Sequence, residues 1–263
     1  MEEPGTWRGA AAYETYVGRW SRLVAGRFVV RLGVPAGSRW LDVGCGTGAL
    51  TEEVLRVCSP ALVLGLDPSA PFVGRAAHIP DPRAAFCQGA AQALPVRDAS
   101  VDAVVSGLVL NFVPDRPAAL AEMRRITRRG GTVATYVWDY ADGMQPIRYF
   151  WDSAVECDPA ARPLDEGVRF PGCRPGPLAE LFTAADLHDV TVEAVVVSTR
   201  FVDFDDYWVP FLGGAGPAPA YVTSLDEDRR SALRRTLRAR VPVADDGSVR
   251  LRARAWAVRG RRP

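Results

Sequence analysis

Apolar residues recur along the chain with two different spacings, which separate predicted strands from predicted helices. Short continuous apolar runs, typical of buried strands, lie at 39–44, 61–67, 101–107 and 132–139. Helical spacing follows the first run over 49–57, and the stretch 114–131 predicts an amphipathic helix with Pro114 and Pro117 near its start and Gly130 beyond its end. This alternation favours a parallel sheet with helices on both faces.

The second half of the chain continues the pattern less regularly. A helix is predicted at 178–190 and a strand at 191–201. In the last run, 249–258, apolar residues occupy alternate positions and arginines stand between several of them. Such alternation is expected of a strand with one polar face.

The composition is that of an ordinary globular protein. The 263 residues are 48% hydrophobic and 24% charged, with a net charge of +1. The first ten residues are acidic and polar, unlike a secretory signal, and the most apolar stretch, 101–113, is too short for a bilayer and carries Asp102 and Asn111. We therefore expect a cytoplasmic protein without a membrane span.

All 32 basic residues are arginine, which indicates a GC-rich genome more than a selected basic surface. Many lie in the stretch 224–241, which predicts a solvated surface helix with a capping box of Ser224 and Glu227. A net charge of +1 does not point to a nucleic-acid partner. The five cysteines are widely spread without a CxxC pair, so we expect reduced thiols and no metal site.

A glycine-rich turn joins the first predicted strand to the helix that follows it. Gly44, Gly46 and Gly48 form a GxGxG pattern, which permits a sharp turn and a close approach of a ligand to the backbone. The helix after it offers its free N–H groups to something polar or anionic. A tight turn without a ligand is the alternative reading of this pattern alone.

The next predicted strand ends in an acidic residue, Asp67. Because the carboxyl ends of neighbouring parallel strands lie side by side, Asp67 is expected beside the glycine turn. A carboxylate there can accept hydrogen bonds from both hydroxyls of a ribose. The alternative is an Asp that only begins a turn before Pro68.

The stretches "LDVGCGTG", "LGLDPS", "FCQGAAQALPVRDASVDAVVSGLVLNFVPD" and "EMRRITRRGGTVATYVWD" resemble, in order and spacing, the motifs of class I S-adenosylmethionine-dependent methyltransferases. The resemblance covers about 40–138 and is strongest to the small-molecule branch that includes the ubiquinone/menaquinone-type enzymes. It implies a Rossmann-like sheet of seven mostly parallel strands with the last strand antiparallel, and S-adenosylmethionine as cofactor.

The resemblance also implies roles for individual residues. Asp42 and the three glycines match positions that hold the methionine end of the cofactor, and Asp67 with Pro68 those that hold the ribose. Ala90 stands where relatives have an Asp for the adenine, so Ala91 and Gln92 are the remaining candidates for that contact. The other candidate cofactor residues are Ser106 and Leu108, around the end of "VDAVVSG", and Tyr16 and Arg19 in a helical flap over 1–35.

Two inserts extend the predicted single methyltransferase domain, 1–263, beyond its minimal core. They cover 139–177 and 201–246, after the fifth and sixth strands, and are expected to form a cap that selects the substrate. The candidate substrate residues are Asn111, Trp138, Tyr140, Tyr207, Trp208 and Phe211. Closure of a small satellite core by these aromatic residues is the alternative, and the two roles are compatible.

The predicted activity is methyl transfer to a small-molecule acceptor by in-line displacement, which requires alignment and exclusion of water. Neither His78 nor His188 is expected to face the site, and we assign no catalytic base. A catalytically silent S-adenosylmethionine-binding or interaction protein is the main alternative; an RNA methyltransferase and an NAD-dependent dehydrogenase, whose fingerprint is GxGxxG, are weaker ones. The sequence names neither the acceptor nor the oligomeric state.

Overall fold

The structure is a computed structural model that describes residues 19–213 and 216–263. The chain divides into two compact units. Unit 2 takes in Ser21–Val137, Gly172–Val195 and Ala255–Pro263, whereas unit 1 takes in Trp138–Pro171, Val196–Arg254 and, of the described residues before Ser21, Arg19 and Trp20. The predicted inserts, 139–177 and 201–246, thus fall largely in unit 1.

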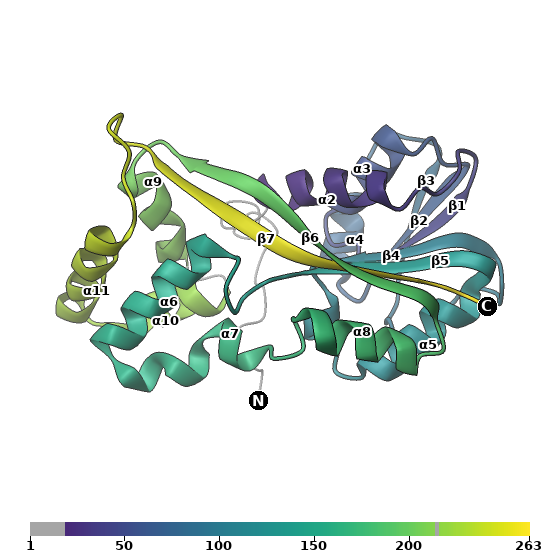
Figure 1. The fold of residues 1–263 in the computed structure, drawn as a ribbon. Coiled ribbons are helices and arrows are strands. Elements are labelled where there is room, and N and C mark those ends of the chain that lie inside the picture. Colours follow the sequence, from purple (N-terminus) through teal and green to yellow (C-terminus); the bar gives the residue numbers. More distant parts are fainter. Residues whose placement is uncertain (1–18, 214–215) are drawn as a thin grey trace. The chain divides into compact units, whose positions relative to one another are not determined.

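A seven-stranded sheet forms the centre of unit 2, with strands β6 and β7 continuing into unit 1 (Figure 1). The strands are β1 Arg39–Val43, β2 Leu62–Asp67, β3 Ala84–Gln88, β4 Val101–Gly107, β5 Thr127–Trp138, β6 His188–Phe201 and β7 Val249–Arg261. Their order is β3-β2-β1-β4-β5-β7-β6, and the pairs from β3 to β5 are parallel. The predicted Rossmann-like sheet is confirmed.

The strand order reverses direction between β1 and β4. Trp40, Leu41 and Val104 of these two strands are fully buried, since their side chains form the centre of the core. In open α/β sheets ligands bind beyond the carboxyl ends of the strands at such a reversal. The ends of β1 and β4 therefore mark where a site is expected.

Helices cover both faces of this sheet, with α2 and α3 on one side and α5 and α8 on the other (Figure 1). The helices of unit 2 are α2 Arg19–Arg31, which begins at the boundary with unit 1, α3 Ala49–Val57, α4 Ala70–Ala76, η2 Leu110–Phe112, α5 Arg116–Ile126 and α8 Pro175–Ala184. Each buries one apolar face; α5, for example, buries Leu120, Met123 and Ile126.

The junction between α5 and β5 differs from the predicted one. The helix ends at Ile126 and the strand begins at Thr127, so Gly130 lies within β5 and does not terminate the helix. Gly130 N donates to Arg262 O at 2.7 Å and Arg262 N donates to Gly131 O at 3.0 Å, which sets two residues of β5 against one. This is a β-bulge, and Gly130 adopts the left-handed φ of +73° that such a bulge requires.

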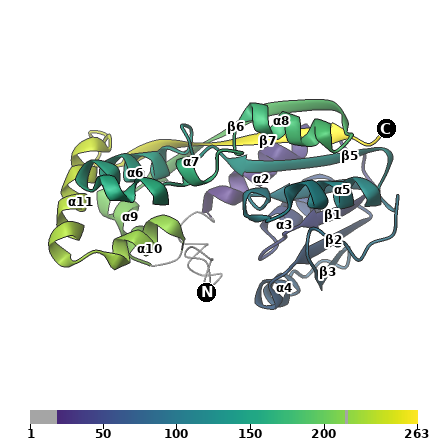
Figure 2. The ribbon, with the colours of Figure 1, turned by 90° about the horizontal axis from the view of Figure 1, so that it is seen from below.

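Unit 1 is mostly helical, as Figure 2 shows. Its helices are α6 Gln145–Cys157, η3 Pro159–Leu164, α7 Glu166–Arg169, α9 Phe204–Trp208, η4 Val209–Gly213, α10 Pro217–Ser224 and α11 Glu227–Arg240. The predicted helix at 224–241 thus forms, but its N-cap is Asp226, whose carboxylate accepts from Arg229 N. The predicted capping box is wrong, because Ser224 belongs to α10 and bonds to Tyr221 O.

Aromatic side chains form the core of unit 1. Phe150 stacks on Phe211 with ring centroids 4.5 Å apart, and Tyr207 packs edge-on against Phe201 and Phe211. Tyr207 also donates its hydroxyl to Pro146 O at 2.7 Å. The satellite core that the sequence left as an alternative therefore exists.

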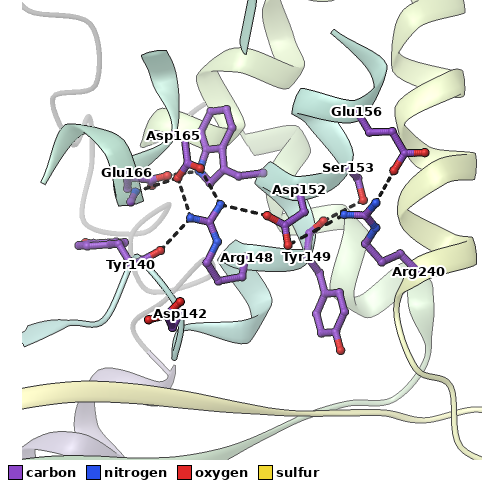
Figure 3. A network of polar contacts seen from close by, with 12 residues as sticks. Tyr140, Asp142, Arg148, Tyr149, Asp152, Ser153, Glu156, Asp165, Glu166 and Arg240 are labelled. Atoms are coloured by element: carbon purple, nitrogen blue, oxygen red, sulfur yellow. Dashed lines mark hydrogen bonds and ion pairs between the residues drawn. The ribbon is translucent and has the colours of Figure 1, made fainter. Parts of the chain in front are cut away.

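A buried polar network ties α6 to α7 within unit 1 (Figure 3). Arg148 makes two hydrogen bonds to Asp165, at 2.9 and 2.7 Å, and a third to Tyr140 O. Next to it the Trp151 indole N–H donates to Glu166, and burial raises the pKa of this carboxyl to about 7 although the indole opposes the shift. These residues fix the position of α7 by directional bonds as well as by packing.

None of the described helices is both long and apolar enough to cross a bilayer.

Candidate active site

The glycine turn between β1 and α3 adopts a backbone that only glycine tolerates easily. Gly44, Gly46 and Gly48 have φ values of +75°, +55° and +94°. A Cβ atom on Gly44 would lie 2.5 Å from Val109 Cγ1, and one on Gly48 would lie 2.4 Å from Ile79 Cδ1. Packing therefore disfavours a side chain at Gly44 in particular, because three atoms of Val109 would lie within 3.0 Å, whereas the end of the flexible Ile79 side chain can move away from Gly48.

Gly46 differs from its two neighbours in the turn. A Cβ atom there would meet nothing within 4 Å, so the described part of the chain does not fill this space. Its N–H donates to Asp67 Oδ2 at 3.0 Å. The middle of the turn is thus anchored to β2 and open on the other side, as expected where a ligand approaches the backbone.

Asp67 occupies the place beside the turn that its position at the end of β2 predicted. Its second oxygen, Oδ1, accepts from Ser69 N at 2.8 Å, and the side chain is buried. Burial raises the pKa of this carboxyl, and the two backbone hydrogen bonds, from Ser69 and Gly46, oppose the shift. Asp67 thus begins a turn and also places a carboxylate beside Gly46.

Asp42, on β1, is fully buried under the same turn. Thr51 Oγ1 of α3 donates to Asp42 Oδ2 at 2.7 Å, whereas Asp42 Oδ1 has no hydrogen-bond partner among the described residues. Burial raises the pKa of Asp42 to about 7, opposed mainly by the bond from Thr51 and increased further by the charge of Asp67. A buried acceptor without a partner is costly, and a bound cation would satisfy it.

The segment that follows β4 packs onto the glycine turn. Leu108 has the unusual φ of +61° and donates its N–H to Tyr136 O, and Val109 next to it contacts Gly44. Asn111, in η2, has both amide atoms buried without a partner among the described residues. An amide that can both donate and accept is therefore available after β4.

Comparison with known proteins identifies the family. A methyltransferase-domain family model matches residues 41–135. A demethylmenaquinone methyltransferase of Roseiflexus castenholzii is 35% identical over 176 residues, which cover 61% of this chain and 72% of that protein.

The chain belongs to the class I S-adenosylmethionine-dependent methyltransferases.

Two solved structures share the fold of this methyltransferase. The YcgJ protein of Bacillus subtilis has a TM-score of 0.59 at 17% identity, and the match covers 92% of this chain and 99% of that one. Phosphoethanolamine N-methyltransferase 2 of Haemonchus contortus, solved in complex with S-adenosyl-L-methionine, has a TM-score of 0.60 at 15% identity over 96% of this chain and 56% of its own.

The cofactor of the methyltransferase is S-adenosylmethionine, and the residues around the glycine turn of unit 2 fit it. The orphaned Oδ1 of Asp42 suits the ammonium of the methionine moiety, because a buried carboxylate oxygen needs a cationic or donor partner. The open side of Gly46 leaves room for a ligand at the backbone. Asp67 can accept hydroxyl hydrogen bonds in addition to its two backbone contacts, since each carboxylate oxygen has two lone pairs.

The remaining predicted cofactor residues differ in their burial and in their contacts. Pro68 is tied through its carbonyl to Gln88 Nε2, Ala91 is buried, and Gln92 is half-buried. The Ser106 carbonyl accepts from the Thr135 hydroxyl at 2.8 Å. Tyr16 lies outside the described residues, and of Arg19 only the backbone, at the start of α2, is described.

Of the predicted substrate residues, Asn111 lies in unit 2 and the other five lie in unit 1. All five are buried: Trp138, Tyr140, Tyr207, Trp208 and Phe211. Tyr207 and Phe211 also line a small apolar pocket of unit 1 together with Met144 and Ile147. A role in substrate binding stays a prediction for all six residues.

The hydrogen bond from the Thr51 hydroxyl to Asp42 was not predicted from the sequence. The signal that could have found it is a polar residue on the buried face of the helix after the glycine turn, where Leu50 and Val54 are also buried. His78 and His188, which were not expected to face the site, are both exposed residues of unit 2. Within residues 19–213 and 216–263 no group of His, Cys, Asp and Glu is placed to hold a metal ion.

Proposed function

We propose that this methyltransferase modifies a small-molecule acceptor, and that Asn111 contacts it. The observation that carries the proposal is the Asn111 amide, whose two polar atoms are buried without a partner on the segment that packs onto the glycine turn. A buried amide suits one small polar group more than an extended polymer, which would require an exposed basic face.

S-adenosylmethionine supplies an electrophilic methyl group when it is bound, and the task of the chain is to bind, orient and exclude water. We assign the ammonium to Asp42, the ribose to Asp67 and Pro68, and the adenine to Ala91 and Gln92. The three glycines, Ser106 and Leu108 contribute backbone contacts, and Tyr16 and Arg19 stay candidates for the carboxylate of the methionine end. Asn111 is neutral, so its role is to orient the nucleophile and not to remove its proton.

Relatives indicate which acceptors to test. The proteins most similar in sequence include, besides demethylmenaquinone methyltransferases, a trans-aconitate 2-methyltransferase of Deinococcus radiodurans that is 37% identical over 97 residues, 37% of this chain and 36% of that protein. According to their names, these relatives methylate demethylmenaquinone, which is a quinone, and trans-aconitate, which is a small carboxylic acid. We propose an acceptor of comparable size whose polar group contacts the buried amide of Asn111.

The experiment is methyl transfer from isotope-labelled S-adenosylmethionine to a panel containing a short-chain quinol, trans-aconitate and total RNA. Transfer to a small molecule with a reduced rate in Asn111→Ala and an unchanged cofactor Kd would support the proposal. Transfer to RNA alone would contradict it. Binding of the cofactor without transfer to any member would favour the silent cofactor-binding protein.

A further inference from the structure

Thr51 joins the glycine turn to the acid beneath it. The residue lies in the first turn of α3, is fully buried, and donates its hydroxyl to Asp42 Oδ2 at 2.7 Å. The hydroxyl therefore occupies one oxygen of Asp42 and leaves the other, Oδ1, as the orphaned acceptor.

Among the described residues, no positive side chain contributes to the pKa of Asp42. The influences on its carboxyl are burial, the Thr51 hydroxyl, the negative charge of Asp67 and the Thr51 backbone N–H. Cys45, in the turn, also faces it, and burial raises the pKa of that thiol so that it stays neutral. Its neighbour in register on β4 is the apolar Val105. Only Thr51 favours the ionised carboxyl from within the described chain.

We propose that Thr51 is a positioning residue for the cofactor: its hydroxyl holds Asp42 so that the free oxygen faces the ammonium, and cofactor binding is coupled to loss of a proton from Asp42. The inference rests on the proposed contact between Asp42 and the ammonium. Proton loss accompanies binding because an ammonium beside the carboxylate stabilises the ionised form.

This coupling gives affinity a defined dependence on pH. With the pKa of Asp42 at about 7 in the free protein, the carboxyl must lose a proton before it can pair with a cation below that pH. The Kd for an ammonium-bearing ligand is therefore expected to fall as pH rises toward 7 and to level off above it. Removal of the Thr51 hydroxyl should move this profile to higher pH, because the ionised carboxyl loses its one side-chain donor.

The test is calorimetric titration with S-adenosylhomocysteine from pH 5.5 to 8.5 for wild type, Thr51→Val and Thr51→Ser. In Thr51→Val we expect the Kd at pH 7 to rise about tenfold, the weak end of the range for a hydrogen bond to a charged group, and to recover at higher pH. Thr51→Ser keeps the hydroxyl and should restore the wild-type profile. The ligand 5′-methylthioadenosine lacks the ammonium, so its Kd should be independent of pH and of the Thr51 substitution.

Two controls make the outcome decisive. Thr127→Val removes another fully buried hydroxyl, which bonds to Met123 O at 2.7 Å, and reports the general effect of such a loss. An unchanged pH profile in folded Thr51→Val would overturn the proposal, as would the same shift in Thr127→Val. Asp42→Asn tests the proposed contact between Asp42 and the ammonium separately from the role of Thr51. Unchanged affinity of this variant for S-adenosylhomocysteine would refute the ammonium contact. Weakened affinity of Asp42→Asn, together with an unshifted pH profile in Thr51→Val, would refute only the role of Thr51.

Discussion

Gly46 and Gly37 share a left-handed backbone but differ in what lies beside them. Both have positive φ, +55° and +76°, and a Cβ atom on either would meet no described atom within 4 Å. Gly37 lies in an exposed turn before β1, whereas Gly46 lies between β1 and α3, beside Asp67. The pair therefore separates the cost of conformation from the cost of lost ligand contact.

We predict that Gly46→Ala and Gly37→Ala each lower the free energy of unfolding by roughly 1–2 kcal/mol, the cost of a left-handed side-chain-bearing residue. Only Gly46→Ala should also raise the Kd for S-adenosylhomocysteine, by about tenfold or more, which corresponds to a loss of roughly 1.4 kcal/mol of binding free energy. Thermal unfolding and calorimetry measure the two effects. Equal Kd values in the two variants would contradict the placement of the ligand at Gly46.

At Asp67 the expected loss is in binding. We predict that Asp67→Ala reduces the binding free energy of the cofactor by about 1.5–3 kcal/mol, which is typical of a lost hydrogen bond to a charged group. Calorimetry with S-adenosylhomocysteine measures the loss, and Asp67→Asn, which keeps an oxygen for one backbone N–H, controls for damage to the turn. A folded Asp67→Ala protein with wild-type affinity would refute the ribose contact.

Among residues, the sequence predicted positions better than contacts. The GxGxG spacing and the acid at the end of the next strand placed Asp67 beside Gly46, because short-range chain geometry determines both. The bond from Thr51 to Asp42 depends on how α3 packs on β1, which spacing alone does not reveal.

Helix α11 offers a test at the scale of one element. Asp226 caps its first turn, whereas the predicted cap, Ser224, belongs to the preceding helix. We predict that Asp226→Ala lowers the free energy of unfolding by about 1 kcal/mol, a typical cost of a lost N-cap. Ser224→Ala should cost clearly less, and thermal unfolding compares the two. A larger loss of stability in Ser224→Ala than in Asp226→Ala would instead support the predicted capping box.

Element boundaries were the least predictable feature of the fold. The predicted helical stretch 114–131 included "TRRGG" at its end, although the strand begins at Thr127. Pairing with the end of the chain decides this boundary, since Arg262 bonds to Gly130 and Gly131. A partner so distant in sequence leaves no local signal in a helical pattern.

Across the molecule, buried carboxyls make stability depend on pH. The pKa of Glu166 is raised by burial from 4.5 to about 7, so between these values the folded protein binds more protons than the unfolded chain. Stability therefore falls as pH rises through this window. The full effect of such a shift is up to roughly 3 kcal/mol.

We predict that Glu166→Gln, which keeps an acceptor for Trp151 but never ionises, gains stability over wild type as pH rises from 5 to 8. Denaturant unfolding at several pH values measures the difference, and the contribution of Asp42 cancels because both proteins retain it. The exposed Glu180→Gln is a control for the loss of one charge. A difference independent of pH would show that Glu166 is already ionised at pH 5.

At this scale the sequence predicted the sheet of unit 2 but not the interior of unit 1. Parallel strands and their helices repeat a regular pattern, whereas the network of Arg148, Asp165, Trp151 and Glu166 joins separate helices of an insert. Charged residues in such segments are usually exposed, and only tertiary packing reveals that these are buried.

The place of β7 between β5 and β6 also affects how the chain matures on the ribosome. Strands β1 to β5 emerge in order and can pair as they appear, but β6 has no neighbour until β7, the last strand of the sheet, has been synthesised. Until then β5 presents an open, apolar edge, which is a template for unwanted pairing between nascent chains. Slow translation of the codons between β5 and β7 would therefore lengthen the period in which this edge of the sheet is exposed.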